Sequence, residues 1–204
     1  MSDKELKIHQ RKQGIAGRKG LPAELKREYS KLITERLLKL EAYERACTIL
    51  SYQPFGGEVD TGPFNHAAEA MGKRLAYPIS EAEGILVPAV PKGPDSWAVG
   101  KFGICAPLKD KSLIISPGEI DLAIVPCTAF CAVRLMRVGM GAGYYDRFLP
   151  KCQNALTVAV AFEVQRIDNL HCDSWDVPLD RVVSEKAVYG GLTGIGSKNL
   201  EGEQ

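Results

Sequence analysis

The sequence predicts one α/β domain over residues 1–190, with a largely parallel, mixed central sheet and helices on both faces. Short apolar runs typical of buried strands alternate with segments of helical periodicity, and this alternation favours parallel strand pairing. The 204 residues also suffice for one hydrophobic core, and no internal repeat divides them. Residues 191–204, rich in glycine, serine and charges, are expected to form a flexible tail.

The predicted elements follow in order along the chain. Residues 3–20 are basic and polar, and the glycines at 14, 17 and 20 are expected to interrupt any long regular helix. Leu21 and Pro22 open an amphipathic helix that is expected to end near residues 43–46. Residues 47–52, 120–126, 156–162 and 181–184 are predicted strands, 64–71 a helix, 74–78 and 85–90 short apolar runs, and 91–116 a loop-rich stretch.

Composition excludes several classes of partner. Lys and Arg (26) nearly balance Asp and Glu (25), so a general nucleic-acid binder is not expected. The apolar runs are too short to cross a bilayer, and the N-terminus lacks an apolar signal core, so we expect a cytoplasmic protein. The six cysteines contain no Cys-x-x-Cys pair and are expected to be free thiols. A monomer or weak oligomer is expected.

Residues 137–149 carry the strongest functional signal. Glycines at every second position, Gly139, Gly141 and Gly143, leave backbone amides free to face an anion. The apolar segment after them predicts a helix, whose N-terminus favours phosphate. Asp146 then places a carboxylate where a phosphate-bound cation would sit. The alternative is an inert glycine-rich turn before a core helix.

Two familiar phosphate-binding loops are excluded. The spacing Gly-x-Gly-x-Gly differs from the dinucleotide fingerprint, and the segment has no Gly-Lys-Ser/Thr triplet. Polar residues also follow the predicted strands, as Glu58 and Asp60 do after residues 47–52. Because ligands of open α/β sheets bind at the carboxyl ends of strands, this placement favours a functional loop.

Together these motifs resemble the 5-formyltetrahydrofolate cyclo-ligase (methenyltetrahydrofolate synthetase) family over residues 4–186. The most specific block is residues 137–147, which resembles the family signature Arg-x-Gly-x-Gly-x-Gly-Tyr-Tyr-Asp-Arg. Supporting blocks follow in family order: Lys7 with Arg11, residues 58–61, 72–74, 101–104, 124–126, 129–130, 161–163 with Gln165, and 175–180.

The resemblance implies an enzyme that uses ATP and Mg²⁺ to convert 5-formyltetrahydrofolate, with or without a polyglutamate tail, into 5,10-methenyltetrahydrofolate. In that reaction the formyl oxygen takes the γ-phosphoryl group, N10 attacks the activated carbon, and phosphate leaves. Such phosphoryl transfer depends on positioning and charge neutralisation rather than on an enzyme nucleophile.

The resemblance also implies site residues. ATP is expected to bind Lys7, Arg11, Arg137, Gly139, Met140, Gly141, Ala142, Gly143, Tyr144 and Tyr145. Glu58, Arg137 and Tyr145 are the expected catalytic residues, and Gln53, Glu58 and Tyr144 the expected folate contacts. Asp146 and Asp176 are the expected Mg²⁺ ligands, with Asp180 as the alternative to Asp176. Further candidates are Phe55, Trp97 and Phe102 as walls, and Arg74 and Lys101 for the glutamate tail.

Other interpretations of these residues stay open. Lys7 and Arg11 could belong to a solvated basic N-terminus, and Asp146 could simply balance a helix dipole. Ala106 stands where the family has an acidic residue. Cys131 and Arg134 also depart from the family's Phe-Asp-x-x-Gly, with one additional residue before the glycines. These departures favour the alternative of a non-catalytic paralogue that binds nucleotide or folate. A third reading is a phosphosugar or acyl-transfer enzyme on the same scaffold.

Overall fold

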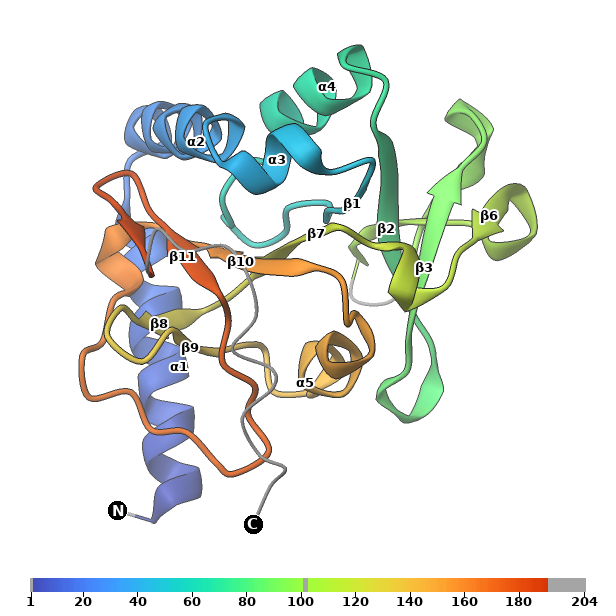
Figure 1. Ribbon diagram of the computed structural model, residues 1–204. Helices are drawn as coiled ribbons and strands as arrows, with labels where there is room; N and C mark the ends of the chain where they lie inside the picture. The colour runs from blue at the N-terminus through green and yellow to red at the C-terminus, as the bar shows by residue number, and fades with distance from the viewer. Residues whose placement is uncertain (1, 101–102, 191–204) are drawn as a thin grey trace, which may run out of the picture.

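A mixed sheet of eight strands forms the centre of the computed structural model, which describes residues 2–100 and 103–190 (Figure 1). The strands lie in the order β12, β11, β10, β7, β1, β2, β3 and β6. Their bounds are Thr48–Leu50 (β1), Arg74–Ser80 (β2), Leu86–Pro91 (β3), Ser112–Ile114 (β6), Leu122–Pro126 (β7), Leu156–Val160 (β10), Arg181–Val183 (β11) and Val188–Tyr189 (β12). The predicted tail, residues 191–204, lies outside the described part of the chain.

Strand pairing agrees with the predicted class. β11, β10, β7, β1 and β2 are joined by parallel pairs, whereas β12, β3 and β6 are added antiparallel at the two sides. The central strands β1, β7 and β10 are almost entirely buried, as expected for parallel strands covered on both faces. The predicted α/β class with a largely parallel sheet is confirmed.

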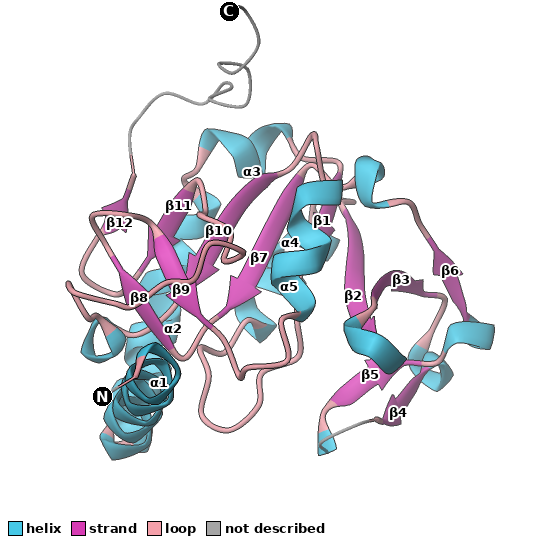
Figure 2. Cartoon of the chain, turned by 90° about the horizontal axis from the view of Figure 1, so that it is seen from below, coloured by secondary structure: helices cyan, strands magenta, loops and turns pink. Residues whose placement is uncertain are grey.

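Two layers cover the sheet (Figures 1 and 2). Helices α2 (Ala23–Leu38), α3 (Glu41–Arg45) and α4 (Gly62–Ala70) lie on one face, where Ile33, Leu37 and Phe64 pack into the first core. The other face is covered by α5 (Tyr144–Phe148) and the hairpin of β8 (Ala129–Cys131) and β9 (Met136–Val138). Phe130 and Phe148 belong to the second core there.

The predicted helix over residues 22–46 is in fact two helices. α2 ends at Leu38, and Leu40 takes an extended conformation with φ −72° and ψ 131° before α3 begins. This turn directs the Leu40 side chain against the first core. Burial of an apolar side chain therefore outweighs continuation of the helix.

The prediction for residues 3–20 was wrong, because they form one helix, α1 (Asp3–Gly20). A Cβ at Gly14 would lie 1.9 Å from the carbonyl oxygen of Thr128, and one at Gly17 would lie 3.0 Å from that of Val164. The two glycines therefore allow α1 to pack closely on the loops after β7 and β10. A glycine costs a helix only about 1 kcal/mol relative to alanine, which this packing offsets.

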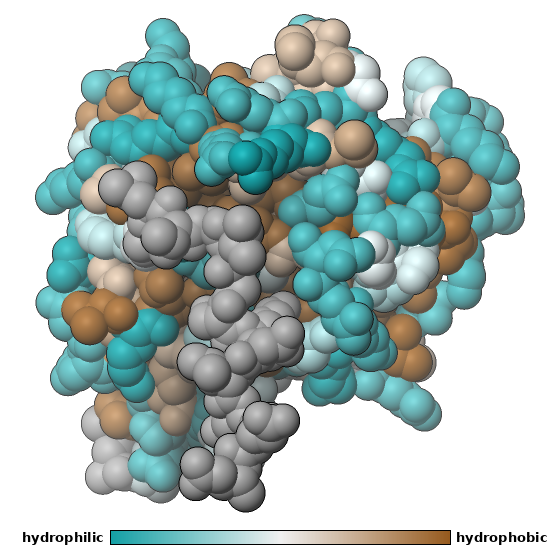
Figure 3. Space-filling view, in the orientation of Figure 1, coloured by the Kyte–Doolittle hydropathy of each residue, from teal (hydrophilic) through white to brown (hydrophobic). Residues whose placement is uncertain are grey.

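The loop-rich prediction for residues 91–116 was wrong in part. This segment contains β6 and a separate antiparallel ribbon of β4 (Trp97–Val99) and β5 (Cys105–Pro107). Strands of three residues between glycines and prolines are too short to give an alternating pattern. The face seen in Figure 3 is mostly hydrophilic, with apolar residues in separate patches. Among the described helices, none has both the length and the apolar character needed to cross a membrane.

Candidate active site

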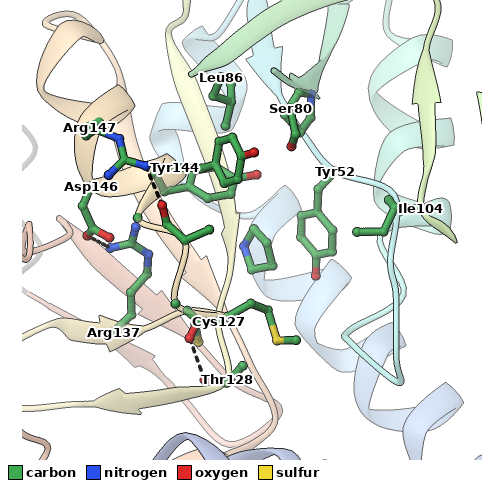
Figure 4. Close-up of a pocket in the computed structure, with 18 of the residues that line it drawn as sticks. Tyr52, Ser80, Leu86, Ile104, Cys127, Thr128, Arg137, Tyr144, Asp146 and Arg147 are labelled. Carbon is green, nitrogen blue, oxygen red and sulfur yellow. Dashed lines mark hydrogen bonds and ion pairs between the residues drawn. The ribbon is translucent and has the colours of Figure 1, made fainter. Parts of the chain in front are cut away.

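A cavity of about 1240 Å³ lies where the central strands end. Tyr52 follows β1, Ser80 ends β2, and Cys127 follows β7, and all three line it (Figure 4). Residues of α1 and of the β4–β5 ribbon, which flank the strand ends in Figure 2, also contribute. The volume exceeds the roughly 300–1,000 Å³ of a typical small-molecule pocket, so there is room for two ligands.

The glycine loop of residues 139–143 forms one wall of this cavity. Gly141 has φ +103° and Gly143 φ +65°, a left-handed conformation that other residues rarely adopt. A Cβ at Gly141 would also lie 3.2 Å from the Arg11 guanidinium, whose Nε donates to the carbonyl of Gly139 over 2.8 Å. The backbone therefore favours glycine at positions 141 and 143, and the loop holds a cation from α1 beside its backbone.

The helix predicted after this loop is present but short. α5 has five residues, so its dipole adds little, and anion binding by this wall rests on cations and loop amides. Two side chains of α5 bind the turn between β2 and β3. Tyr144 donates its hydroxyl to the carbonyl of Glu81 over 2.9 Å, and Arg147 Nε donates to that of Gly84 over 3.2 Å. These bonds connect α5 to the β2–β3 hairpin, of which Ser80 and Leu86 line the cavity.

Lys7 and Arg11 lie one turn apart on one face of α1, and both line the cavity. Lys7 Nζ lies 2.6 Å from an oxygen of Asp173 and 2.5 Å from one of Asp176. The hydrogen bond from Lys7 holds the pKa of the Asp173 carboxyl below its usual value. Lys7 and Arg11 are therefore part of the cavity wall, whereas Lys12 and Lys19 of the same helix are exposed and lie outside it.

Arg137 and Asp146 form a second ion pair in the cavity wall, with 3.0 Å between Nη1 and Oδ1 (Figure 4). Arg137 is only 4% exposed, and its Nε has no hydrogen-bond partner in the described part of the protein. Its guanidinium lies over the ring of Tyr145, 5.8 Å from the centroid. A buried cation with an unused donor is suited to binding an anion that enters the cavity.

The two expected metal ligands, Asp146 and Asp176, both line the cavity, each paired with a cation. Asp180, the alternative, does not line it. Its carboxylate accepts hydrogen bonds from the amide and the hydroxyl of Thr157, at 2.8 and 2.7 Å. In residues 2–100 and 103–190 no three His, Cys, Asp or Glu side chains cluster as a preformed metal site. A metal ion here would need ligands from the substrate or water as well.

Glu58 lines the cavity from the loop after β1, and its side chain is 12% exposed. One carboxylate oxygen accepts the amide of Phe55 over 3.1 Å, and the other lies 3.5 Å from Nη1 of Arg18. Burial raises the pKa of the Glu58 carboxyl, although the Phe55 amide and Arg18 oppose this. Gln53, also a predicted folate contact, lines the same cavity.

Tyr145 adds an unpartnered donor. Its hydroxyl is buried and has no hydrogen-bond partner within the described residues. Burial, with a smaller contribution from Glu58, raises the pKa of this phenol above its ordinary value. The group therefore stays protonated at neutral pH and is available to donate a hydrogen bond to a ligand.

Comparison with known proteins identifies the family of this chain. The family model described as "5-formyltetrahydrofolate cyclo-ligase family" matches residues 3–185. The chain belongs to this family. It is 28% identical to the 5-formyltetrahydrofolate cyclo-ligase of Escherichia coli, covering 84% of this chain and 96% of that protein. The solved structure of Aquifex aeolicus 5,10-methenyltetrahydrofolate synthetase is similar with a TM-score of 0.78 and 30% identity, covering 96% of this chain and 100% of that one.

More distant relatives agree. The mouse 5-formyltetrahydrofolate cyclo-ligase is 25% identical, over 82% of this chain and 87% of its own. The Mycoplasma pneumoniae 5,10-methenyltetrahydrofolate synthetase structure shares the fold, with a TM-score of 0.72 at 24% identity, covering 88% of this chain and 98% of that one. The predicted family and the predicted enzyme class, a cyclo-ligase, are confirmed.

Some side chains predicted for the folate half of this cyclo-ligase cavity lie elsewhere. Phe55 is 39% exposed and does not line the cavity. Trp97 packs edge-on against Tyr77, with 4.8 Å between ring centroids, and with Arg74 it lines a separate, smaller cavity. Phe102 and Lys101 lie outside the described residues. The apolar wall comes instead from Pro78, Ile79, Leu86, Ala98, Val99 and Ile104, on the β2–β3 and β4–β5 hairpins.

The departures from the family pattern fall in two places. Ala106 lines the cavity beside the exposed Cys105. Cys131 is buried in β8, where its Sγ lies 3.3 Å from the carbonyl of Asp168, and Arg134 donates to the carbonyl of Leu170. Neither Cys131 nor Arg134 lines the cavity, so only Ala106 alters its lining. Cys47, Cys105, Cys127, Cys131 and Cys172 are free thiols, as predicted.

Sequence reasoning missed Arg18, which is 2% exposed beneath the cavity. Its spacing offered a signal. Lys7, Arg11, Gly14 and Arg18 follow one another at intervals of four, three and four residues, which places them on one face of a helix. The expectation that the glycines interrupt the helix makes no use of this spacing.

Proposed function

We propose that this protein converts 5-formyltetrahydrofolate into 5,10-methenyltetrahydrofolate with ATP and Mg²⁺. The observation that carries the proposal is the cavity itself. It joins the glycine loop with Lys7, Arg11 and Arg137 on one side to Glu58 and an apolar wall on the other. One half suits a triphosphate and the other suits a pterin, which needs apolar walls and a few aimed polar groups.

The residues of the first half fit ATP. Lys7, Arg11 and Arg137 are among the cations that line the cavity, the buried Nε of Arg137 lacks a partner among the described residues, and the glycine loop leaves its backbone accessible. Lys7, Arg11 and Arg137 would neutralise phosphate charge, and the amides of residues 139–145 would add neutral donors. Asp146 and Asp176 would hold Mg²⁺, which supplies charge neutralisation at the phosphates when bound.

Binding in this half requires an exchange of partners. Lys7 now binds Asp176 and Arg137 binds Asp146, so both carboxylates become available to a metal ion only when the cations turn to another anion. The phosphates of ATP provide that anion. We therefore propose that nucleotide and Mg²⁺ bind together.

The residues of the second half position the folate. Tyr145 would donate its unpartnered hydroxyl to the formyl oxygen or to the phosphate that forms on it. Glu58 and Gln53 would bind polar edges of the pterin, and Tyr144 would form part of the wall. Ring closure then needs N10 held close to the formyl carbon, which is a task of positioning rather than of covalent catalysis.

The test is the absorbance of the methenyl product with the purified protein. We expect product only when ATP, Mg²⁺ and 5-formyltetrahydrofolate are all present, with the Escherichia coli relative as positive control. No product while that control works would refute the proposal. Tight binding of either ligand without turnover would instead support a non-catalytic paralogue, for which Ala106 in the cavity is the specific observation. Binding of a sugar phosphate but not folate would indicate a different enzyme on this scaffold.

A further inference from the structure

We propose that Arg18 is a positioning residue for this reaction, which holds the Glu58 carboxylate in place and keeps it ionised, so that Glu58 meets the folate as a hydrogen-bond acceptor. The inference deepens the proposed function and rests on it. It starts from the close packing of α1 on Thr128, which the missing side chain of Gly14 permits. This packing accompanies the contacts of Arg18, in the last turn of α1, with Glu58 and Cys127, which line the cavity.

Arg18 is a buried cation with few partners. Nη1 lies 3.5 Å from Oε1 of Glu58 and 3.4 Å from the carbonyl of Cys127, and Nε has no partner in the described residues. A guanidinium taken out of water needs an anion nearby, and Glu58 is the carboxylate within ion-pair distance. The Arg18–Glu58 pair therefore stays together, because burying either charge without the other would cost free energy.

The other groups that face Glu58 are neutral at physiological pH. They are Tyr52 after β1, Tyr145 on α5 and Cys127 after β7, each with a coulombic interaction with Glu58. Burial raises the pKa of both phenols, and it raises the pKa of the Cys127 thiol to about 12. Burial favours the protonated form of Glu58, and Arg18 is the cation that opposes it.

The state of Glu58 decides what it can do for the folate. An ionised carboxylate accepts hydrogen bonds from N–H groups of a pterin, whereas a protonated one would donate at the same place. Its second oxygen already accepts the Phe55 amide, so the orientation of the carboxylate is set before a ligand arrives. Arg18 has no place in the cavity lining and therefore acts through Glu58.

The direct test is carbon NMR of protein labelled at the glutamate side-chain carboxyls, with Glu58 assigned by its absence in Glu58→Gln. In the wild-type protein we expect the Glu58 carboxyl to titrate with a midpoint below pH 7. Arg18→Met should raise this midpoint by about one to three pH units, the effect of removing an opposite charge at close range. Arg18→Lys, which keeps the charge, and Lys19→Met, which removes an exposed cation next to it, should leave the midpoint close to the wild-type value.

Kinetics give the second measurement. Arg18→Met should move the acid limb of kcat/KM for folate to higher pH by the same amount, and weaken folate binding near pH 7 by about tenfold or more. The KM for ATP should change little. In the Glu58→Gln background, Arg18→Met should cause no further change in the acid limb or in folate binding. Neither partner is charged in this double variant. It can therefore still be compared with Glu58→Gln if Arg18→Met alone fails to fold.

The outcomes separate the two proposals. A wild-type midpoint above pH 7, or an unchanged midpoint in Arg18→Met, would overturn the role of Arg18 while the function stands. An equal loss in the Glu58→Gln background would show a merely structural role for Arg18. No product from the wild-type protein would refute the proposed function, and the inference about folate with it, whatever the NMR titration shows.

Discussion

At the scale of single residues, the ion pairs of the cavity determine how the candidate metal ligands can act. Asp146 is 21% exposed at its side chain and shares one oxygen between Arg137 and the amide of Val177. Because Arg137 is almost fully buried, an uncharged residue at position 146 would leave that cation without its partner. The same substitution would remove a proposed ligand of Mg²⁺.

Asp146→Asn is therefore expected to lower turnover by at least about tenfold, with a larger deficit at limiting Mg²⁺. The measurement is methenyl-product formation as a function of Mg²⁺ concentration, with circular dichroism to establish that the protein is folded. Asp180→Asn is the matched control, because its carboxylate binds Thr157 outside the cavity. It should lose about 1 kcal/mol of stability and keep its turnover. The reverse pattern would make Asp180 the metal ligand.

Local patterns identified some site residues, and tertiary contacts placed the others. The glycine loop could be predicted because left-handed backbone and alternating glycines are properties of the adjacent residues themselves. The prediction that Phe55 and Trp97 form cavity walls was wrong. The sequence shows that a residue is aromatic, but it does not show whether its ring faces the cavity or another part of the protein. The partner of Arg18 is 40 positions away, so nothing near Arg18 indicates an ion pair.

At the scale of elements, helix α1 shows why its glycines do not interrupt it as predicted. In an isolated helix glycine is a weak helix former, and three in one segment favour interruption. In the protein, Gly14 and Gly17 instead give the space in which the helix meets the carbonyls of Thr128 and Val164. The central strands β1, β7 and β10 are correctly predicted, because burial on both faces leaves a continuous apolar run in each. The strands β4 and β5 are only partly buried and lie among glycines and prolines, so they carry no such run.

Gly14→Ala is expected to destabilise the protein by about 1–3 kcal/mol, because the new methyl group would overlap the Thr128 carbonyl unless α1 moved. Moving α1 would also displace Lys7, Arg11 and Arg18, so we expect weaker binding of ATP. Urea unfolding and nucleotide titration measure the two effects. Gly20→Ala, where nothing lies within 4 Å of the added carbon, should be neutral or stabilising by up to about 1 kcal/mol. Equal behaviour of the two variants would contradict this account of α1.

At the scale of the whole molecule, the cavity gathers parts of the chain that are far apart in sequence. Arg11 comes from α1, Leu86 from β3, Gly141 from the glycine loop and Asp176 from the segment before β11. A ligand pair that contacts all of them would join these parts more tightly. The stability of the entire fold should therefore depend on both ATP and Mg²⁺, the two ligands proposed for the nucleotide half.

Thermal unfolding is expected to show this dependence. At a concentration of Mg²⁺ and a non-hydrolysable ATP analogue near a hundred times Kd, the native state gains about 2.7 kcal/mol, which raises Tm by roughly 5–11 °C. Either component alone should give a much smaller rise, because Lys7 and Arg137 then remain with Asp176 and Asp146. An equal rise with the metal-free nucleotide would show that the carboxylates do not take part.

The bonds from α5 to the β2–β3 turn have a consequence for protein engineering. Exposed turns usually tolerate inserted peptides and tags. The Ala82–Gly84 turn is expected to be an exception. The carbonyls of Glu81 and Gly84 accept hydrogen bonds from the side chains of Tyr144 and Arg147 on α5. An insertion there would disturb nucleotide binding without touching a nucleotide contact. The turn at Met71 and Gly72, where Met71 is exposed and no neighbour lies close to Gly72, is the better place for an inserted label.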